Sequence, residues 1–129
     1  MKILIIEDDE SIIQIMTTIL KSKFNPTITT CQTFDQFSDV IDSSEDNIND
    51  FDFVICDHNF PYFENERPQG LGQDVFFELN SVSFSNHFIH FSSQPCPELY
   101  DLRNSDHCRI TFRSFQKNLF TGNDSLINY

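Results

Sequence analysis

The chain has 129 residues, a net charge of −12 and a pI of about 4.4. Only 8 Lys and Arg residues occur, and none form a basic run, which argues against binding to nucleic acid or to an anionic membrane surface. The length fits one domain spanning residues 1–129, and the acidic balance favours divalent cations and basic proteins as partners.

The cysteines and histidines indicate neither a disulfide framework nor a structural zinc site. The 4 cysteines include no C-x-x-C pair, and the 4 histidines are scattered. The apolar stretch after Met1 is too short for a signal peptide or a membrane span. We therefore expect a cytoplasmic protein.

The first elements are a strand and a helix. Ile3 to Ile6 form a short apolar run, which is typical of a central strand in a parallel sheet. Acidic residues follow at once, and either Asp8 or Asp9 can cap the next helix. Apolar residues then recur at helical spacing to about Lys23, where an Asn-Pro pair ends the helix.

The middle of the chain repeats this alternation. Thr27 to Cys31 is rich in β-branched residues and predicts a second strand. Phe34 to Ile41 has helical spacing, and Asp74 to Leu79 indicates a third helix. Between these helices, Phe51 to Cys56 is a second strong apolar run, and it too ends in an acid, Asp57.

The last third has weaker signals. Phe88 to Phe91 predicts a fourth strand, which ends at Ser92. Pro95 to Arg103 holds a weak helix at best, Cys108 to Phe112 predicts a fifth strand, and Phe115 to Phe120 begins a last helix. Strands that alternate with helices imply an α/β fold with a parallel sheet.

Functional groups of such sheets gather at the carboxyl ends of the strands. In this chain those ends carry Glu7 and Asp8, Asp57, Ser92 and Arg113. If the first and third strands are neighbours, about 4.8 Å apart, their carboxylates share one small space and require a cation. Oxygen ligands suit Mg²⁺, and an Asp beside Mg²⁺ is a known phosphoryl acceptor.

The remaining groups at this edge complete the same chemistry. A hydroxyl at Ser92 could donate a hydrogen bond to a phosphoryl group on Asp57, and Arg113 could pair with that group's charge. His58 follows the acceptor directly and is expected to shape access to it.

Three segments resemble receiver domains of bacterial two-component response regulators. KILIIEDDE, residues 2–10, is similar to the opening strand and acidic cluster of that family. FDFVICDHNFP, residues 51–61, resembles the phosphoacceptor strand, and FIHFSS, residues 88–93, resembles the strand that ends in the switch residue. The resemblance spans the chain and implies a flavodoxin-like, doubly wound sheet of five parallel strands in the order 2-1-3-4-5, with helices on both faces.

The resemblance also implies individual roles at the metal and acceptor positions. Asp57 would accept a phosphoryl group from a histidine kinase or a phosphotransfer protein. Glu7, Asp8 and Asp57 would hold Mg²⁺, with the backbone carbonyl of Asn59 as a further ligand. Self-phosphorylation and slow self-dephosphorylation would follow, without enzymatic turnover of a substrate.

Further implied roles concern switching and output. Ser92 would be the switch hydroxyl, Arg113 the phosphate-pairing cation, and Asn59 and Gln94 would tune the lifetime of the phosphoryl group. The signal would pass through the face of the fourth helix, fifth strand and fifth helix to a downstream protein effector. The same face could form a homodimer.

The last third departs from the family pattern and leaves an alternative open. Arg113 stands where the family has Lys, Ser114 where it has Pro, and Ile110 where it has an aromatic residue, although Lys117 could instead supply the cation. These departures favour a pseudo-receiver, an interaction module that acts without phosphorylation. A Mg²⁺-dependent phosphatase-like hydrolase is the third hypothesis, and no general acid for it is evident.

Overall fold

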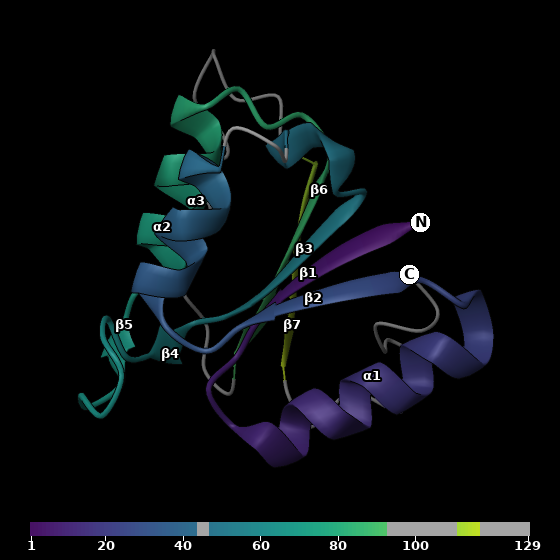
Figure 1. The fold of residues 1–129 in the computed structure, drawn as a ribbon, viewed down its shortest axis with the longest axis horizontal. Helices are drawn as coiled ribbons and strands as arrows, with labels where there is room; N and C mark the ends of the chain where they lie inside the picture. The colour runs from purple at the N-terminus through teal and green to yellow at the C-terminus, as the bar shows by residue number, and fades with distance from the viewer. Residues whose placement is uncertain (44–46, 93–110, 117–129) are drawn as a thin grey trace.

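The computed structural model describes residues 1–43, 47–92 and 111–116, and its main feature is a five-stranded parallel sheet (Figure 1). The strands lie in the order β2-β1-β3-β6-β7, which is 2-1-3-4-5 when these five are counted along the chain, so the predicted topology is confirmed. Their bounds are Lys2–Ile6 for β1, Thr27–Cys31 for β2, Phe53–Asp57 for β3, His87–Ser92 for β6 and Thr111–Gln116 for β7.

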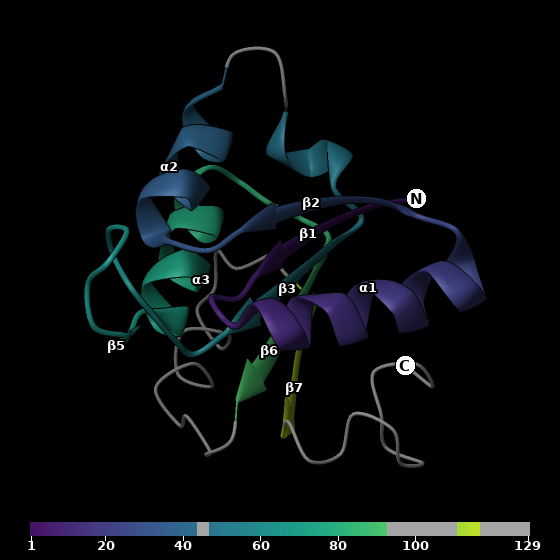
Figure 2. The same cartoon turned by 60° about the horizontal axis from the view of Figure 1, so that its bottom comes forward.

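Helix α1, Glu10–Phe24, covers one face of the sheet (Figure 2). It begins because the Asp9 side chain accepts a hydrogen bond from the Ser11 N–H, and it ends at Asn25, which adopts a left-handed conformation with φ of 49°. The predicted helix is confirmed, and of the two candidate caps Asp9 is the one used. Its buried side chains pack on alternate strand residues and form one core: Met16, Leu20, Ile3, Ile5, Ile55 and Ile89.

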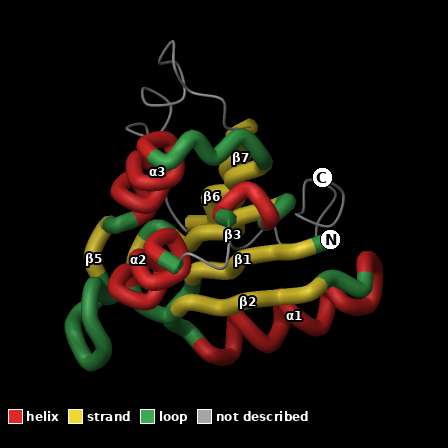
Figure 3. Tube along the Cα trace, turned by 45° about the horizontal axis from the view of Figure 1, so that its top comes forward, coloured by secondary structure: helices red, strands yellow, loops and turns green. Residues whose placement is uncertain are grey.

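Helices α2, Phe34–Asp42, and α3, Gly72–Ser81, cover the opposite face (Figure 3). The expectation of helices on both faces is therefore confirmed. The larger core lies here, because the other set of alternate strand residues meets the apolar sides of both helices. Its fully or nearly fully buried members include Leu4, Ile6, Val54, Cys56, Phe88, Phe37, Val75, Phe76 and Leu79.

Two short elements lie outside the predicted helices and strands. A 3-10 turn, Ile48–Asp50, precedes β3. A two-stranded antiparallel ribbon pairs β4, Asn59–Phe60, with β5, Gln69–Gly70. This ribbon lies between β3 and α3 in the chain.

The fifth strand of the main sheet differs from our expectation. We expected a strand at Cys108–Phe112 and a helix from Phe115, but strand β7 continues to Gln116. The backbone of β7 pairs with β6 over six positions, and this ladder includes Phe115, so no helix begins there. The weak helix expected at residues 95–103 lies outside the described residues. Within the described part of the chain, no helix is both long and apolar enough to span a membrane.

Candidate metal centre

Three acidic side chains meet at the carboxyl edge of the sheet. Ile6 at the end of β1 lies opposite Cys56 of β3, so the residues that follow them, Glu7 and Asp57, are level across neighbouring strands. Oxygen atoms of Glu7, Asp8 and Asp57 all lie within 4.8 Å of one another. The strand order therefore brings together the three carboxylates that the sequence pattern singled out.

Local hydrogen bonds hold two of these acids in place. The Glu7 N–H donates to the Cys31 carbonyl at 3.0 Å, which extends the pairing of β1 with β2 by one residue. Oε1 of Glu7 accepts the Asp9 N–H at 3.2 Å, and Oδ1 of Asp57 accepts the His58 N–H at 2.8 Å. Glu7 and Asp57 are only 1% and 4% exposed.

Asp9 caps helix α1 and is not part of the carboxylate cluster. Its Oδ1 accepts the Ser11 N–H at 3.0 Å and the Ser11 hydroxyl at 2.6 Å. The half-buried Asp8 is therefore the residue of this acidic run that joins Glu7 and Asp57. A helix cap and a carboxylate cluster thus use adjacent acids for different purposes.

The donor set fits a hard divalent cation. All three groups are carboxylates, and no Cys or His ligand atom belongs to the group. Carboxylates crowded at low exposure repel one another, and a doubly charged cation offsets that repulsion. Mg²⁺ binds through one or two carboxylates, keeps several waters and bridges to phosphate oxygens. The chemistry of these residues therefore fits Mg²⁺.

Cys56 lies beside the cluster but does not share its chemistry. Its thiol donates a hydrogen bond to the Asp57 carbonyl oxygen at 3.0 Å. Burial, and then the charges of Asp57 and Glu7, raise the pKa of the Cys56 thiol well above its ordinary value. The group stays protonated and acts as a small core residue, as the apolar run around it indicated.

His58 connects Asp57 to the start of α3 and to β6. Its carbonyl accepts the N–H groups of Leu71 at 2.9 Å and Gly72 at 3.0 Å. Its ring meets the ring of His90 edge to face, with centroids 5.2 Å apart. The sequence singled out His58 but missed His90, which is fully buried and follows Ile89 in β6.

Gly72 should not tolerate a side chain. A Cβ there would lie 2.9 Å from His58 Nδ1 and 3.1 Å from His58 Cα. We expect Gly72→Ala to lower the free energy of unfolding by about 1–3 kcal/mol, the usual penalty for overpacking. Urea denaturation measures this loss. In a His58→Ala background the part of the loss that the ring causes should disappear while the backbone contact remains, and an equal loss in both backgrounds would show that the ring is not the obstacle.

His90 should make stability depend on pH. Burial, and then the neighbouring His58, lower the pKa of His90 from 6.5 to about 4. The folded state therefore binds this proton less readily than the unfolded chain, so the stabilisation is complete above pH 6.5 and is lost as pH falls toward 4. The loss should reach up to about 3 kcal/mol. The free energy of unfolding, measured with urea at several pH values between 4 and 6.5, should depend less on pH in His90→Gln than in the wild type. An unchanged dependence on pH would contradict the assignment.

The structure describes some of the other predicted site residues. Asn59 is exposed in β4, and Ser92 ends β6 one residue beyond Phe91, which lies opposite Asp57. Gln94 lies outside the described residues. Sequence reasoning placed Arg113 at the carboxyl end of its strand, and this is wrong, because Arg113 lies opposite Ile89 within the strand.

The register identifies the described residue that does lie at that end. Gln116 is opposite Ser92, and Lys117 is the next residue in the sequence. Lys117 itself lies outside the described residues. The misplacement arose because we expected the strand to end at Phe112 rather than at Gln116.

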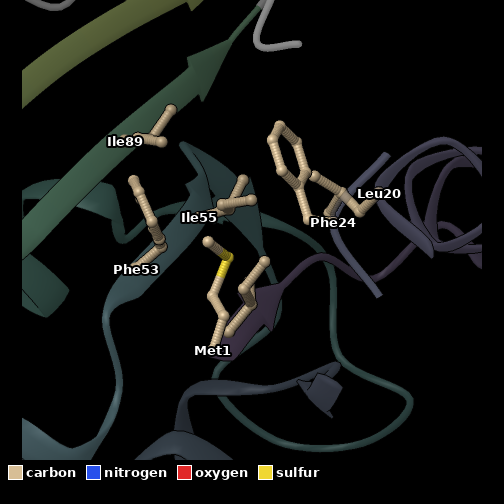
Figure 4. A pocket seen from close by; sticks show the side chains of 7 residues that line it. Met1, Leu20, Phe24, Phe53, Ile55 and Ile89 are labelled. Carbon is tan, nitrogen blue, oxygen red and sulfur yellow. The ribbon is translucent and has the colours of Figure 1, made fainter. Parts of the chain in front are cut away.

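An apolar cavity of about 170 Å³ lies between α1 and the sheet (Figure 4). Met1, just before β1, and Phe53, the first residue of β3, line it together with Leu20 and Phe24 of α1. The seven lining residues carry no polar side chain, so the cavity offers no group for chemistry. The acidic cluster is at the opposite ends of these strands.

Comparison with known proteins relates the chain to solved structures only. No family model matches the sequence, and no curated protein does so either. The receiver domain of the Francisella response regulator 1452 superposes with a TM-score of 0.64 and 19% identity, covering 91% of this chain and 84% of that one. The signal receiver domain of an HD domain-containing protein from Pseudomonas fluorescens Pf-5 superposes with a TM-score of 0.63 and 16% identity. The match covers 91% of this chain and 75% of that one.

A third structure agrees with these two. The non-phosphorylated HemR receiver domain from Leptospira biflexa superposes with a TM-score of 0.61 and 20% identity, covering 88% of this chain and 80% of that one. At such identities a structural likeness establishes the fold, and function has to be argued from the site. The chain has the fold of response-regulator receiver domains.

Proposed function

We propose that this chain is a phosphoacceptor receiver domain, residues 1–129, that takes a phosphoryl group on Asp57 from a histidine kinase or a phosphotransfer protein. The observation that carries the proposal is the cluster of Glu7, Asp8 and Asp57, with oxygens within 4.8 Å, at the carboxyl edge of a sheet with the receiver fold. Such an edge is where open α/β sheets place their reactive groups.

In the proposed transfer, an Asp57 carboxylate oxygen attacks the phosphorus atom as the phosphorus–nitrogen bond of the donor histidine breaks. The electron pair of that bond stays on the donor imidazole, and the product is an acyl phosphate. The His58 N–H, donated to Oδ1 at 2.8 Å, fixes the plane of the carboxylate. Mg²⁺ held by Glu7, Asp8, Asp57 and the Asn59 carbonyl would neutralise charge on the transferring oxygens.

Ser92 and one basic residue complete the proposed site. Ser92 follows the position level with Asp57, which suits a hydroxyl that binds the new phosphoryl group. Arg113 stays the predicted phosphate-pairing cation, but its mid-strand position makes Lys117 a competing candidate. Asn59 and Gln94 would tune the lifetime of the phosphoryl group.

The two candidate cations can be separated by mutation. If Lys117 pairs with the phosphoryl group, Lys117→Ala should slow phosphorylation by acetyl phosphate at least about tenfold, because a charge-assisted contact of at least about 1.4 kcal/mol is lost. Arg113→Ala should then leave the rate unchanged. Initial rates from intact-mass measurements decide between them, and the opposite pattern would support Arg113.

Output would pass by protein contact in the cytoplasm. A local change in charge at Asp57 would bias a two-state element on the face that includes β7, and a downstream effector or a second copy would bind that face. The protein would phosphorylate and slowly dephosphorylate itself without turning over a substrate.

A pseudo-receiver is the second candidate function. The position three residues before the cation holds Ile110 if the cation is Arg113 and Ser114 if it is Lys117, so neither alignment supplies the aromatic switch residue. A module that acts without phosphorylation would not need that residue. The buried carboxylates favour the first function, because a purely structural module gains nothing from acids crowded at low exposure.

Acetyl phosphate tests the proposed function. We expect the wild-type protein to gain one hydroxylamine-labile phosphoryl group when Mg²⁺ is present and none when EDTA removes the metal, as intact-mass spectrometry would show. No gain under either condition, together with no Mg²⁺ binding by calorimetry, would leave the pseudo-receiver as the better account.

A further inference from the structure

The hairpin of residues 59–70 begins two residues after Asp57 and lies between β3 and α3 in the chain. Strands β4 and β5 form its base, and residues 61–68 form its tip. Figure 3 shows it reaching past the carboxyl ends of β1, β2 and β3, beside α2. The hairpin therefore lies at the same edge of the sheet as the end of β3, which carries Asp57.

Backbone contacts hold the hairpin where its base meets its tip. The Phe34 N–H donates to the Pro61 carbonyl at 3.0 Å, and the Asp35 N–H donates to the Tyr62 carbonyl at 3.0 Å. These donors belong to the first turn of α2, whose amides have no partner within the helix. Phe60 is fully buried in the larger core. The tip therefore projects from a fixed base.

A tight turn shapes the tip itself. The Glu66 N–H donates to the Phe63 carbonyl at 3.2 Å, and Asn65 adopts a left-handed conformation with φ of 67°. Asn tolerates this conformation better than most residues. A surface that is already ordered loses less entropy when a partner binds, so its contacts contribute more to affinity.

The tip presents aromatic and acidic side chains together. Tyr62 and Phe63 are 38% and 48% exposed. Tyr62 stacks on Phe34 at 4.9 Å and contacts the Phe63 ring at 4.7 Å, so the rings form one continuous surface. Glu64, Glu66 and one basic residue, Arg67, are exposed beside them, so acids outnumber bases on the tip. Aromatic anchors with a charged rim are typical of protein interfaces.

We propose that this hairpin tip is the docking surface for the protein that donates the phosphoryl group, and that the donor meets it with basic and apolar side chains. The inference rests on the proposed function. The net charge of −12 makes the surface of this chain acidic, which suits a donor that carries basic side chains around its phosphohistidine. The aromatic rings with Glu64 and Glu66 supply contacts for such a donor.

Two phosphodonors test this inference. Acetyl phosphate needs no docking surface, whereas a protein donor does. The protein donor is the fastest of the purified, autophosphorylated histidine kinases and phosphotransfer proteins encoded in the same genome. The variants are Tyr62→Ser with Phe63→Ser, and separately Glu64→Lys with Glu66→Lys; the control is Phe77→Ser on α3, where the side chain is 60% exposed.

We expect the aromatic variant to reduce kcat/KM for the protein donor at least about tenfold, since hot-spot contacts each exceed about 1 kcal/mol. The charge variant should reduce it as well and weaken its dependence on salt. Rates with acetyl phosphate, and all rates of the control, should not change. The charge variant alters only exposed side chains, so it tests the inference even if the aromatic variant fails to fold.

Several outcomes would overturn the inference. One is that both variants accept phosphate from the protein donor at the wild-type rate. Another is that the variants slow phosphorylation by acetyl phosphate as much as transfer from the protein donor. A third is that the variants change only the self-association of the protein. Acceptance of phosphate from acetyl phosphate but from no protein in the panel would also overturn it, and of the proposed function it would leave only the acceptor chemistry of Asp57. Failure of the wild-type protein with acetyl phosphate would instead count against the proposed function.

Discussion

Asp57→Asn should abolish Mg²⁺-dependent phosphorylation by acetyl phosphate. The amide is nearly the same size as the carboxylate, and its oxygen can still accept the His58 N–H that now reaches Oδ1 at 2.8 Å. It lacks the negative charge that makes the carboxylate a nucleophile and a metal ligand. The substitution therefore removes the chemistry while it preserves the local structure. Intact-mass spectrometry after incubation with acetyl phosphate measures the effect.

Asp9→Asn is the matched control for this prediction. Asp9 is two residues from Glu7 in sequence but caps α1 instead of joining the carboxylate cluster. Asn is as good a helix cap as Asp, so both stability and phosphorylation should be retained. If Asp57→Asn still gains a phosphoryl group, the acceptor is another acid, and the assignment of Asp57 is wrong.

Phe76→Ala should cause the largest loss of stability among these predictions. Phe76 is 1% exposed in the core between α3 and the sheet, and its ring meets Phe88 edge to face at 5.3 Å. Removing a buried Phe side chain costs about 3–5 kcal/mol, through lost burial and the cavity that remains. Because total stability is about 5–15 kcal/mol, a large part of it would disappear. Urea denaturation of the metal-free protein measures the loss.

The next residue on the same helix gives the control. Phe77 is 60% exposed, so Phe77→Ala removes little buried area, and Ala favours the helix. We expect its free energy of unfolding to lie within about 0.5 kcal/mol of the wild type. Equal losses at the two positions would mean that α3 does not pack on the sheet as described.

The features that sequence reasoning predicted correctly depend on strong local signals. Two apolar runs, Ile3 to Ile6 and the one that ends at Cys56, place apolar side chains on both faces of the sheet. This pattern is typical of a central strand whose two faces are both covered by helices. These two runs became the adjacent strands β1 and β3, and the acids after them meet for that reason. Helix α1 was equally clear, because its cap, its apolar spacing and its stop signal agree.

The features that it missed depend on contacts between distant parts of the chain. The segment that forms β7 has few apolar residues, so its ends could not be located without its pairing to β6, and Arg113 was misplaced as a result. The ribbon of β4 and β5 has two-residue strands, too short for a periodic pattern. The contact of His58 with His90 joins residues on separate elements.

A crystal structure of the protein grown with Mg²⁺ and beryllofluoride tests the central claim most directly. Beryllofluoride mimics a phosphoryl group on a carboxylate, so it reports the acceptor without the short lifetime of an acyl phosphate. We predict beryllium bonded to a carboxylate oxygen of Asp57 and Mg²⁺ beside it, held by Glu7, Asp8 and Asp57. Beryllofluoride absent from Asp57, or Mg²⁺ bound away from these three acids, would contradict the account.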